Sequence, residues 1–219
     1  LPRQRGAPQL DLARHDGTPA GDALRATGVD VGALQPLYAA DVSRLVRRVR
    51  SRGAQVDIAC DEGELVAGDA RLPLAEVEFE LLSGTTAALL ALAGRWVDRH
   101  GLWLDVRTKA ERGDLLARGR AAADATHAEP PVIEPADTPD AALRAMVRAC
   151  LAQVLPNASA IAAGVHEAEH VHQLRVGLRR LRTALRDFGD AAADLDPGWE
   201  PALAQVFARL GAARDRDAL

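Results

Sequence analysis

The first half of the chain contains short runs in which apolar and polar residues alternate with a period of two. These runs are separated by Gly- or Asp-rich segments and cover residues 42–50, 55–60, 64–67 and 72–82. Because successive side chains of a β-strand point to opposite faces, the alternation predicts strands of an antiparallel sheet. A further short strand is predicted at residues 9–12.

The alternation also sorts charge onto one face of the predicted sheet. The charged positions are Glu76, Glu78 and Glu80 in the last run, Asp57 and Asp61 in the second, and Arg44, Arg48 and Arg50 in the first. Such a face is either a solvated outer surface or a polar lined interior. In an interior, the carboxylates suit Mg²⁺ or Mn²⁺ and the arginines suit phosphate oxygens, which favours metal-assisted phosphoryl chemistry.

Other parts of the chain, including most of its second half, have helical periodicity instead. Segments with this pattern are predicted at residues 22–27, 85–100, 138–155, from 157 onward, at 171–188 and from 199 to at least 214. Residues 120–138 are rich in Pro and Ala, lack a helical period and form a predicted linker. The chain is thus expected to be α+β in two domains, at residues 1–119 and 139–219.

One predicted helix, residues 171–188, carries cations without acidic neighbours, because no Asp or Glu lies between Glu169 and Asp187. At about 100° per residue, five basic residues share an arc of roughly 80°. They are His172, Arg175, Arg179, Arg182 and Arg186. The neighbouring arc is apolar and consists of Leu174, Leu178, Leu181, Leu185 and Phe188.

Like charges at these spacings cost a few tenths of a kcal/mol per pair, and a polyanion would offset that cost. Arginine also forms bidentate contacts with phosphate. The helix therefore favours an anion-binding stripe. Two other interpretations remain open, namely salt bridges to other helices and a surface without a ligand.

Composition narrows the class of protein. With 48% hydrophobic and 26% charged residues the chain is globular, and no apolar run approaches the length of a membrane span, so none is expected. Nucleic-acid binding is disfavoured by the net charge of −4 and by a content of only seven aromatic residues, three Trp, three Phe and one Tyr. Cys60 and Cys150 lack metal-type spacing and fit buried thiols in a reduced cytosol, so a cytoplasmic location is expected. The first and last residues suggest a piece of a longer protein.

Two resemblances are more specific. Residues 56–68, 75–84 and 108–113, in this order, resemble the C-terminal half of a CYTH domain, over roughly residues 38–119. Residues 172–186, followed by 210–217, resemble the start of a CHAD domain, over about residues 139–219. A CYTH domain followed by a CHAD domain is the order seen in proteins similar to bacterial inorganic triphosphatases.

The resemblance implies an antiparallel β-tunnel that binds triphosphate and Mg²⁺ or Mn²⁺, followed by a helical bundle that binds inorganic polyphosphate. The metal ligands would be Glu76, Glu78 and Asp61, with Glu80 added from the acidic row. The triphosphate would contact Arg44 and Lys109. The polyphosphate residues would be His172, Arg175, Arg179, Arg180, Arg182, Arg186 and Arg214, although Arg180 lies near 80° on the wheel, off the stripe.

The chain departs from the family pattern in three places. The first CYTH strand, Glu-x-Glu-x-Lys, and the later CHAD helices are not in this sequence, and Thr108 replaces the usual serine. The expected function is therefore phosphate-chain binding, with triphosphate hydrolysis by the full-length parent and none by this chain alone. The alternative is a non-catalytic polyphosphate-binding module on a degenerate CYTH scaffold.

Overall fold

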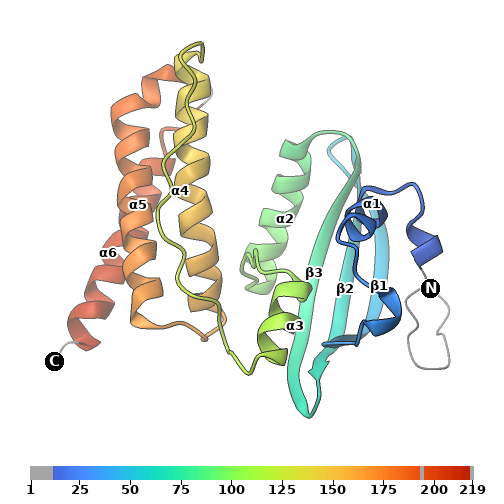
Figure 1. Ribbon diagram of the computed structural model, residues 1–219. Helices are drawn as coiled ribbons and strands as arrows, with labels where there is room; N and C mark the ends of the chain where they lie inside the picture. Colours follow the sequence, from blue (N-terminus) through green and yellow to red (C-terminus); the bar gives the residue numbers. More distant parts are fainter. Residues whose placement is uncertain (1–11, 193–194, 218–219) are drawn as a thin grey trace. The chain divides into compact units, whose positions relative to one another are not determined.

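The computed structural model describes residues 12–192 and 195–217 (Figure 1). The chain divides into two compact units, Leu1–Leu37 and Tyr38–Leu219. The first unit contains the 3₁₀ helices η1 (Leu12–His15) and η2 (Val31–Ala33) and the helix α1 (Pro19–Ala26). The predicted strand at residues 9–12 lies outside the described residues except for Leu12, which is in η1. The helical turn predicted at residues 22–27 falls largely in α1, which Thr18 caps.

The second unit begins with three antiparallel strands, β1 (Ala39–Ser51), β2 (Ala54–Ala67) and β3 (Ala70–Ser83), in the order β1-β2-β3. The sequence prediction of two separate strands between residues 55 and 67 is wrong, because β2 is continuous through Gly63. Gly63 pairs with Val42 on one side and Leu74 on the other. A Cβ at this position would collide with the carbonyl oxygen of Asp41, so the glycine permits close strand pairing and does not end the strand.

The sheet separates apolar and charged side chains as its alternation predicted. Helix α2 (Thr86–His100), capped by Thr85, covers the apolar face. Its Ala88 and Leu92 pack against Val56 and Ile58 of β2. Trp96 stacks edge-on against Phe79 of β3, with ring centroids 5.6 Å apart. The opposite face, with its acidic residues, contacts the short helix α3 (Lys109–Ala117).

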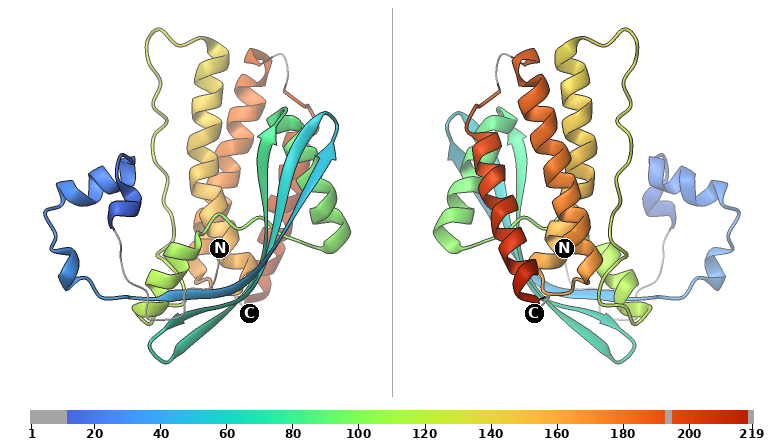
Figure 2. Two further views of the ribbon diagram at one scale, coloured as in Figure 1. Left: turned by 90° about the vertical axis from the view of Figure 1, so that its right-hand side faces the viewer. Right: turned by 90° about the vertical axis from the view of Figure 1, so that its left-hand side faces the viewer.

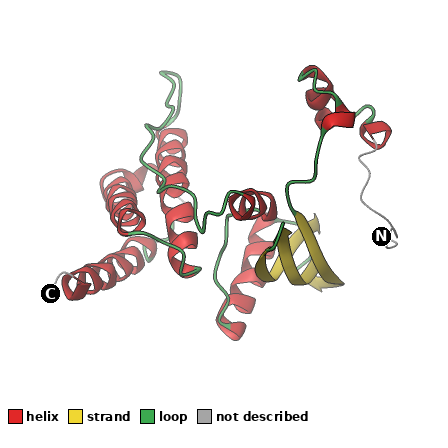
Figure 3. Ribbon diagram, turned by 60° about the horizontal axis from the view of Figure 1, so that its bottom comes forward, coloured by secondary structure: helices red, strands yellow, loops and turns green. Residues whose placement is uncertain are grey.

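The remainder of this unit is helical, with α4 (Pro139–Ala162), α5 (Ala168–Phe188), a 3₁₀ turn η3 (Gly189–Ala191) and α6 (Trp199–Asp217). Figure 3 shows the change from strands to helices along the chain, and the fold is α+β. The break predicted between residues 155 and 157 is wrong, because α4 continues through Pro156. A proline removes one helical hydrogen bond, and the packing of α4 against α5 on both sides of it compensates for that loss.

The apolar seam of α5 forms the helical core. Leu174 and Leu178 pack with Val154 of α4, and Leu181 and Leu185 pack with Cys150. Phe188, the last residue predicted for this seam, is exposed. Side chains of α6, among them Leu203, complete both clusters.

Helix α4 is long and apolar enough, by length and composition alone, to cross a bilayer. Core helices of soluble proteins satisfy the same criterion, so this is weak evidence. Within the described residues, α4 has α5 as its main partner and buries the polar side chains of Gln153, Asn157 and Ser159. These features are those of a core helix.

Candidate functional site

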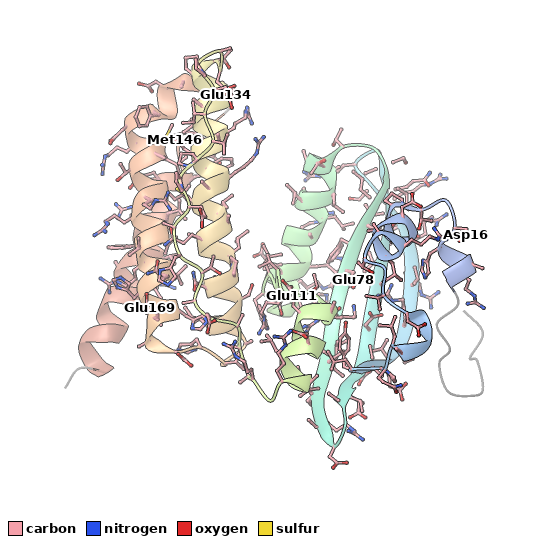
Figure 4. The ribbon with its side chains drawn as sticks, viewed as in Figure 1. Asp16, Glu78, Glu111, Glu134, Met146 and Glu169 are labelled. Carbon is pink, nitrogen blue, oxygen red and sulfur yellow. The ribbon has the colours of Figure 1, made fainter. Side chains whose placement is uncertain are left out.

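Six charged side chains gather on the face of the sheet that contacts α3. We call them the sheet charge cluster, which consists of Asp61, Glu76, Glu78, Arg44, Lys109 and Arg112. The strands supply the carboxylates and Arg44, and α3 supplies the other two cations. Figure 4 labels Glu78 on β3 and Glu111 near the start of α3.

Asp61 is the centre of the cluster, because its side chain is fully buried. The two carboxylate oxygens accept hydrogen bonds from Nε and Nη2 of Arg44, both at 2.6 Å. Lys109 Nζ lies 2.9 Å from the same carboxylate. Arg44 and Lys109 also reach Glu78, at 2.8 and 2.6 Å.

Glu76 completes the network from β3. Its carboxylate contacts both Lys109 and Arg112. Three carboxylates therefore face three cations, and the formal charge of the cluster is zero. This balance removes the repulsion that an isolated row of glutamates would have.

The segment from residue 108 to residue 113 places α3 over this face. Thr108 caps the helix, since its Oγ1 accepts from the N–H of Glu111 while the Glu111 carboxylate accepts from the N–H of Thr108. Threonine is a good N-cap, so its replacement of serine preserves this start. Gly113 is buried against the ring of Tyr38, where a Cβ would not fit. Lys109 and Arg112 are thereby held in the cluster.

The contacts set the protonation states of the cluster. Hydrogen bonds from Arg44 lower the pKa of Asp61 to about 2, against the opposing effect of burial and with further help from Lys109. Burial works to lower the pKa of Lys109, but its bonds to Glu76, Glu78 and Asp61 outweigh burial and raise that pKa above its usual value. Burial tends to raise the pKa of Glu76, but the hydrogen bonds from Lys109 and Arg112 outweigh burial and lower that pKa. These three groups are ionised at neutral pH.

The same carboxylates are the candidate metal ligands. One oxygen each of Asp61, Glu76 and Glu78 lies within 4.8 Å of the others, close enough for one cation to contact all three. Hard carboxylate oxygens suit Mg²⁺ or Mn²⁺. The residues present thus fit such an ion, although Lys109 and Arg44 now occupy the same oxygens.

Not every acidic residue predicted for the metal site joins this group. Glu80 pairs in register with Asp57, one step beyond the cluster, and Asp57 is bound by Arg48 at 2.8 Å. Glu80 lies next to that ion pair and contributes to it electrostatically. The structure therefore brings together three of the four predicted metal ligands.

The basic stripe of α5 divides into two groups. Arg175 and Arg182 face α6, where both guanidinium groups lie over the ring of Phe207, at 5.2 and 5.6 Å from its centroid. Arg175 Nη1 donates to the carbonyl of Leu210 at 3.2 Å, and Arg182 Nε donates to Glu200 at 2.8 Å. For Arg182, the salt bridge to another helix that the sequence left open is present.

The other three members, His172, Arg179 and Arg186, are exposed. In the parts of the chain that the structure describes, no carboxylate pairs with His172 or Arg179. Among the described residues, the acidic partner of Arg186 is its exposed neighbour Asp187, at 2.9 Å. These three basic side chains remain open to a ligand.

Two further residues, Arg180 and Arg214, were predicted to bind polyphosphate. Arg180 lies on another face, where it donates to Gln153 at 2.8 Å and to the carbonyl of Glu129 at 3.0 Å. Arg214 belongs to α6, but its side chain is outside the described residues. His170 is buried at the start of α5, and its Nδ1 accepts from the N–H of Glu167.

Arg112 was missed as a cluster residue. Its spacing of three from Lys109 gave a usable signal, since such residues share a helix face. The buried polar residues Gln153, Asn157 and Ser159 were missed too, because their side chains bind segments distant in sequence.

Two comparisons with known proteins bear on these sites. Residues 145–219 match the family model of the CHAD domain. The chain is also similar to an inorganic triphosphatase of Haemophilus influenzae (strain ATCC 51907 / DSM 11121 / KW20 / Rd), with 31% identity over 83 residues, which are 38% of this chain and 24% of that protein.

The similarity thus spans about a quarter of the relative's length. The family match does not include residues 38–119, for which the CYTH resemblance stays a prediction. The residues that are similar to the CHAD domain, 145–219, include α5 and its arginines.

Proposed function

We propose that this protein binds inorganic polyphosphate on the exposed basic residues of α5. The observation that carries the proposal is the exposed row formed by His172, Arg179 and Arg186, in which the two arginines have so little acidic compensation among the described residues. The CHAD similarity of residues 145–219 supports the same assignment.

The spacing of this row favours a long ligand. Its members are seven residues apart, and at about 1.5 Å per residue each step is about 10.5 Å, so the row extends over about 21 Å. A single phosphate can contact one member of the row, whereas a chain of phosphates can contact all three. Arg175 and Arg182 lie along the edge of the row and are oriented by Phe207.

Binding of polyphosphate to the double variant Arg179→Ala/Arg186→Ala tests the assignment. Each charge-assisted contact is worth on the order of tenfold in affinity, so we expect a loss of roughly tenfold or more and a shallower dependence on salt. The matched control is Arg47→Ala/Arg99→Ala, which removes the same charge from exposed arginines of β1 and α2. Equal affinity of the two double variants at all salt concentrations would contradict the proposal.

A second function is proposed for the sheet charge cluster, namely binding of triphosphate together with Mg²⁺ or Mn²⁺. A dication alone would add charge to a cluster that already holds three cations, so we expect the ion to enter with the polyanion. Arg44 and Lys109 would then turn to the phosphate oxygens and leave carboxylates to the metal. When bound, the metal supplies charge neutralisation to a phosphoanhydride under attack.

We accordingly propose that the full-length parent hydrolyses inorganic triphosphate in the cytoplasm. The similarity to an inorganic triphosphatase supports the hydrolysis. The test is metal-dependent phosphate release by the full-length protein. We expect Glu78→Gln to abolish most of it and Glu80→Gln, outside the cluster, to retain it. If the unsubstituted parent releases no phosphate but binds polyphosphate, the non-catalytic alternative holds.

A competition experiment separates polyphosphate from nucleic acid. The proposal expects single-stranded RNA to compete weakly with polyphosphate, because exposed aromatic rings do not alternate with the basic residues of α5. Displacement of polyphosphate by RNA at equal phosphate concentration would favour a nucleic-acid function.

A further inference from the structure

The segment that connects α3 to α4 lies along the helices of the second half. In Figures 1 and 2 it runs beside α4 over much of that helix. Three of its carbonyl groups accept hydrogen bonds from side chains of α4 and α5. Ala123 is bound by His170 Nε2 at 3.2 Å, Thr126 by Asn157 Nδ2 at 2.9 Å and Glu129 by Arg180 Nη2 at 3.0 Å.

These carbonyls repeat every three residues, which is the period of a polyproline II chain. At about 3.1 Å per residue, the six residues from Ala123 to Glu129 extend over about 19 Å. The α5 residues that bind the two ends, His170 and Arg180, are separated along the helix by about 15 Å, and the long arginine side chain covers the difference. The length of the segment therefore matches the separation of the α5 side chains that bind its two ends.

Recognition depends on the backbone. The side chains of Ala123, Asp124, His127, Ala128 and Glu129 are all exposed, so they bury little apolar area against the helices. A cavity of about 340 Å³ also lies beside the first part of the segment, between Ala122, Pro156 and His170. Hydrogen bonds, more than packing, hold this part of the chain.

The residues that bind the segment are fixed in turn. Asn157 is fully buried and contacts both backbone groups of Thr126, because its Oδ1 also accepts from the Thr126 N–H at 3.1 Å. Arg180 is held by Gln153, whose amide donates to Gln173 at 2.8 Å. Among the described residues, no buried side-chain nitrogen or oxygen lacks a hydrogen-bond partner.

The same helices also hold the chain on the other side of α3. Ser159 Oγ accepts from the N–H of Val106 at 3.1 Å and donates to the carbonyl of Leu104 at 3.3 Å. Helix α3, which supplies Lys109 and Arg112 to the sheet charge cluster, thus lies between two segments anchored to α4 and α5.

We propose that Asn157 of α4 and His170 and Arg180 of α5 form a binding surface for an extended backbone, occupied in cis by residues 122–129 as a strap that ties α3 to the helical part. Asn157, His170 and Arg180 are positioning residues of this strap. Arg180 is consequently not part of the polyphosphate surface, although it stands next to Arg179, which is.

Proteolysis by an endoproteinase that cleaves before aspartate tests the strap in the whole chain. The Asp124 side chain is 91% exposed, so cleavage of the Ala123–Asp124 bond is limited by the bound backbone. We expect Asn157→Ala to accelerate this cleavage on the order of tenfold or more, because two hydrogen bonds to the strap are lost. Cleavage before Asp137, beyond the strap, is the internal control and should not change.

Asn157 is buried, so its substitution also perturbs the packing of α4. Variants in the strap itself test the same contact without a change in the core. Thr126→Pro removes the N–H that Asn157 accepts while it keeps an extended backbone, and we expect it to accelerate cleavage similarly. His127→Pro is the matched control, since it introduces the same ring but removes the His127 N–H, for which no partner is found among the described residues. Equal cleavage rates for the two proline variants would overturn the proposal.

The adjacent arginines give an independent readout. Arg180→Ala should accelerate cleavage at Asp124 and leave polyphosphate affinity within about twofold. Arg179→Ala should weaken polyphosphate binding and leave the cleavage rate unchanged. Only the affinity arm rests on the proposed function, so absence of polyphosphate binding in the unsubstituted chain would count against that function and leave the cleavage arm intact. A loss of polyphosphate affinity in Arg180→Ala without faster cleavage would overturn the assignment of Arg180.

Discussion

The substitution Asp61→Asn tests whether the sheet charge cluster stabilises the fold. Asparagine keeps the shape of the side chain but removes the charge that faces Arg44 and Lys109. The pKa of Asp61 is lowered from 3.8 to about 2. At about 1.4 kcal/mol per pKa unit, this difference corresponds to about 2 kcal/mol of stability at neutral pH.

The assay is urea denaturation of Asp61→Asn and of a matched control, Asp57→Asn. Both aspartates receive two hydrogen bonds from an arginine of β1, four residues apart on the same face. The Asp57 pair is the exposed one, with Arg48 at 62% exposure, so solvent screens it and its loss should matter much less.

For Asp61→Asn we expect the unfolding midpoint to fall by about 1 M urea, given a slope of about 2 kcal/mol/M. Equal midpoints for the two variants would refute the reasoning, because they would show that burial of Asp61 adds nothing to its ion pairs. A change in the slope for one variant alone would instead indicate an altered denatured or native state.

The remaining predictions concern protons, packing and a thiol. Because the folded pKa of Asp61 is depressed, its contribution is present above pH 3.8 and is lost as the pH falls towards 2, so urea titrations should show a smaller difference between wild type and Asp61→Asn at pH 3 than at pH 7. Gly177→Ala should destabilise the protein by about 1–3 kcal/mol, since its Cβ would lie 2.7 Å from Val154, whereas Gly94→Ala, in open space on α2, should stabilise it by up to about 1 kcal/mol. A stable Gly177→Ala variant would show that α4 and α5 can separate without cost. Burial raises the pKa of the Cys150 thiol, so a thiol reagent should label it slowly in the native protein and rapidly in urea, and equal rates would contradict its place in the core.

Much of the local structure could be predicted from the sequence, because the spacing of apolar residues shows which face of a strand or helix is buried. The alternation in β3 separated Glu76 and Glu78 from Val77 and Phe79, and the structure has these pairs on opposite faces. The period of α5 likewise predicted its buried leucines. The ends of strands and helices were harder to predict. Glycine and proline usually interrupt such elements, but Gly63 lies inside β2 and Pro156 lies inside α4.

The chemistry of the sites depended on contacts between distant segments. The sequence alone gave a row of carboxylates. Only the fold brings Lys109 of α3 onto Asp61, 48 positions away, and Arg112 onto Glu76, 36 positions away, which makes the cluster neutral. A helical wheel cannot include α6, so it could not separate Arg175 and Arg182, which stack on Phe207, from Arg179.

By itself, then, the sequence determined which side chains share a face, the order of sheet and helices, and the stripe of basic residues on α5. These are properties of one strand or one helix at a time. The tertiary structure decided which charges are compensated, which arginines remain open to a ligand and where the connecting segment lies. Those outcomes depend on pairs of residues far apart in the chain, and only the packed fold brings such pairs within hydrogen-bond distance.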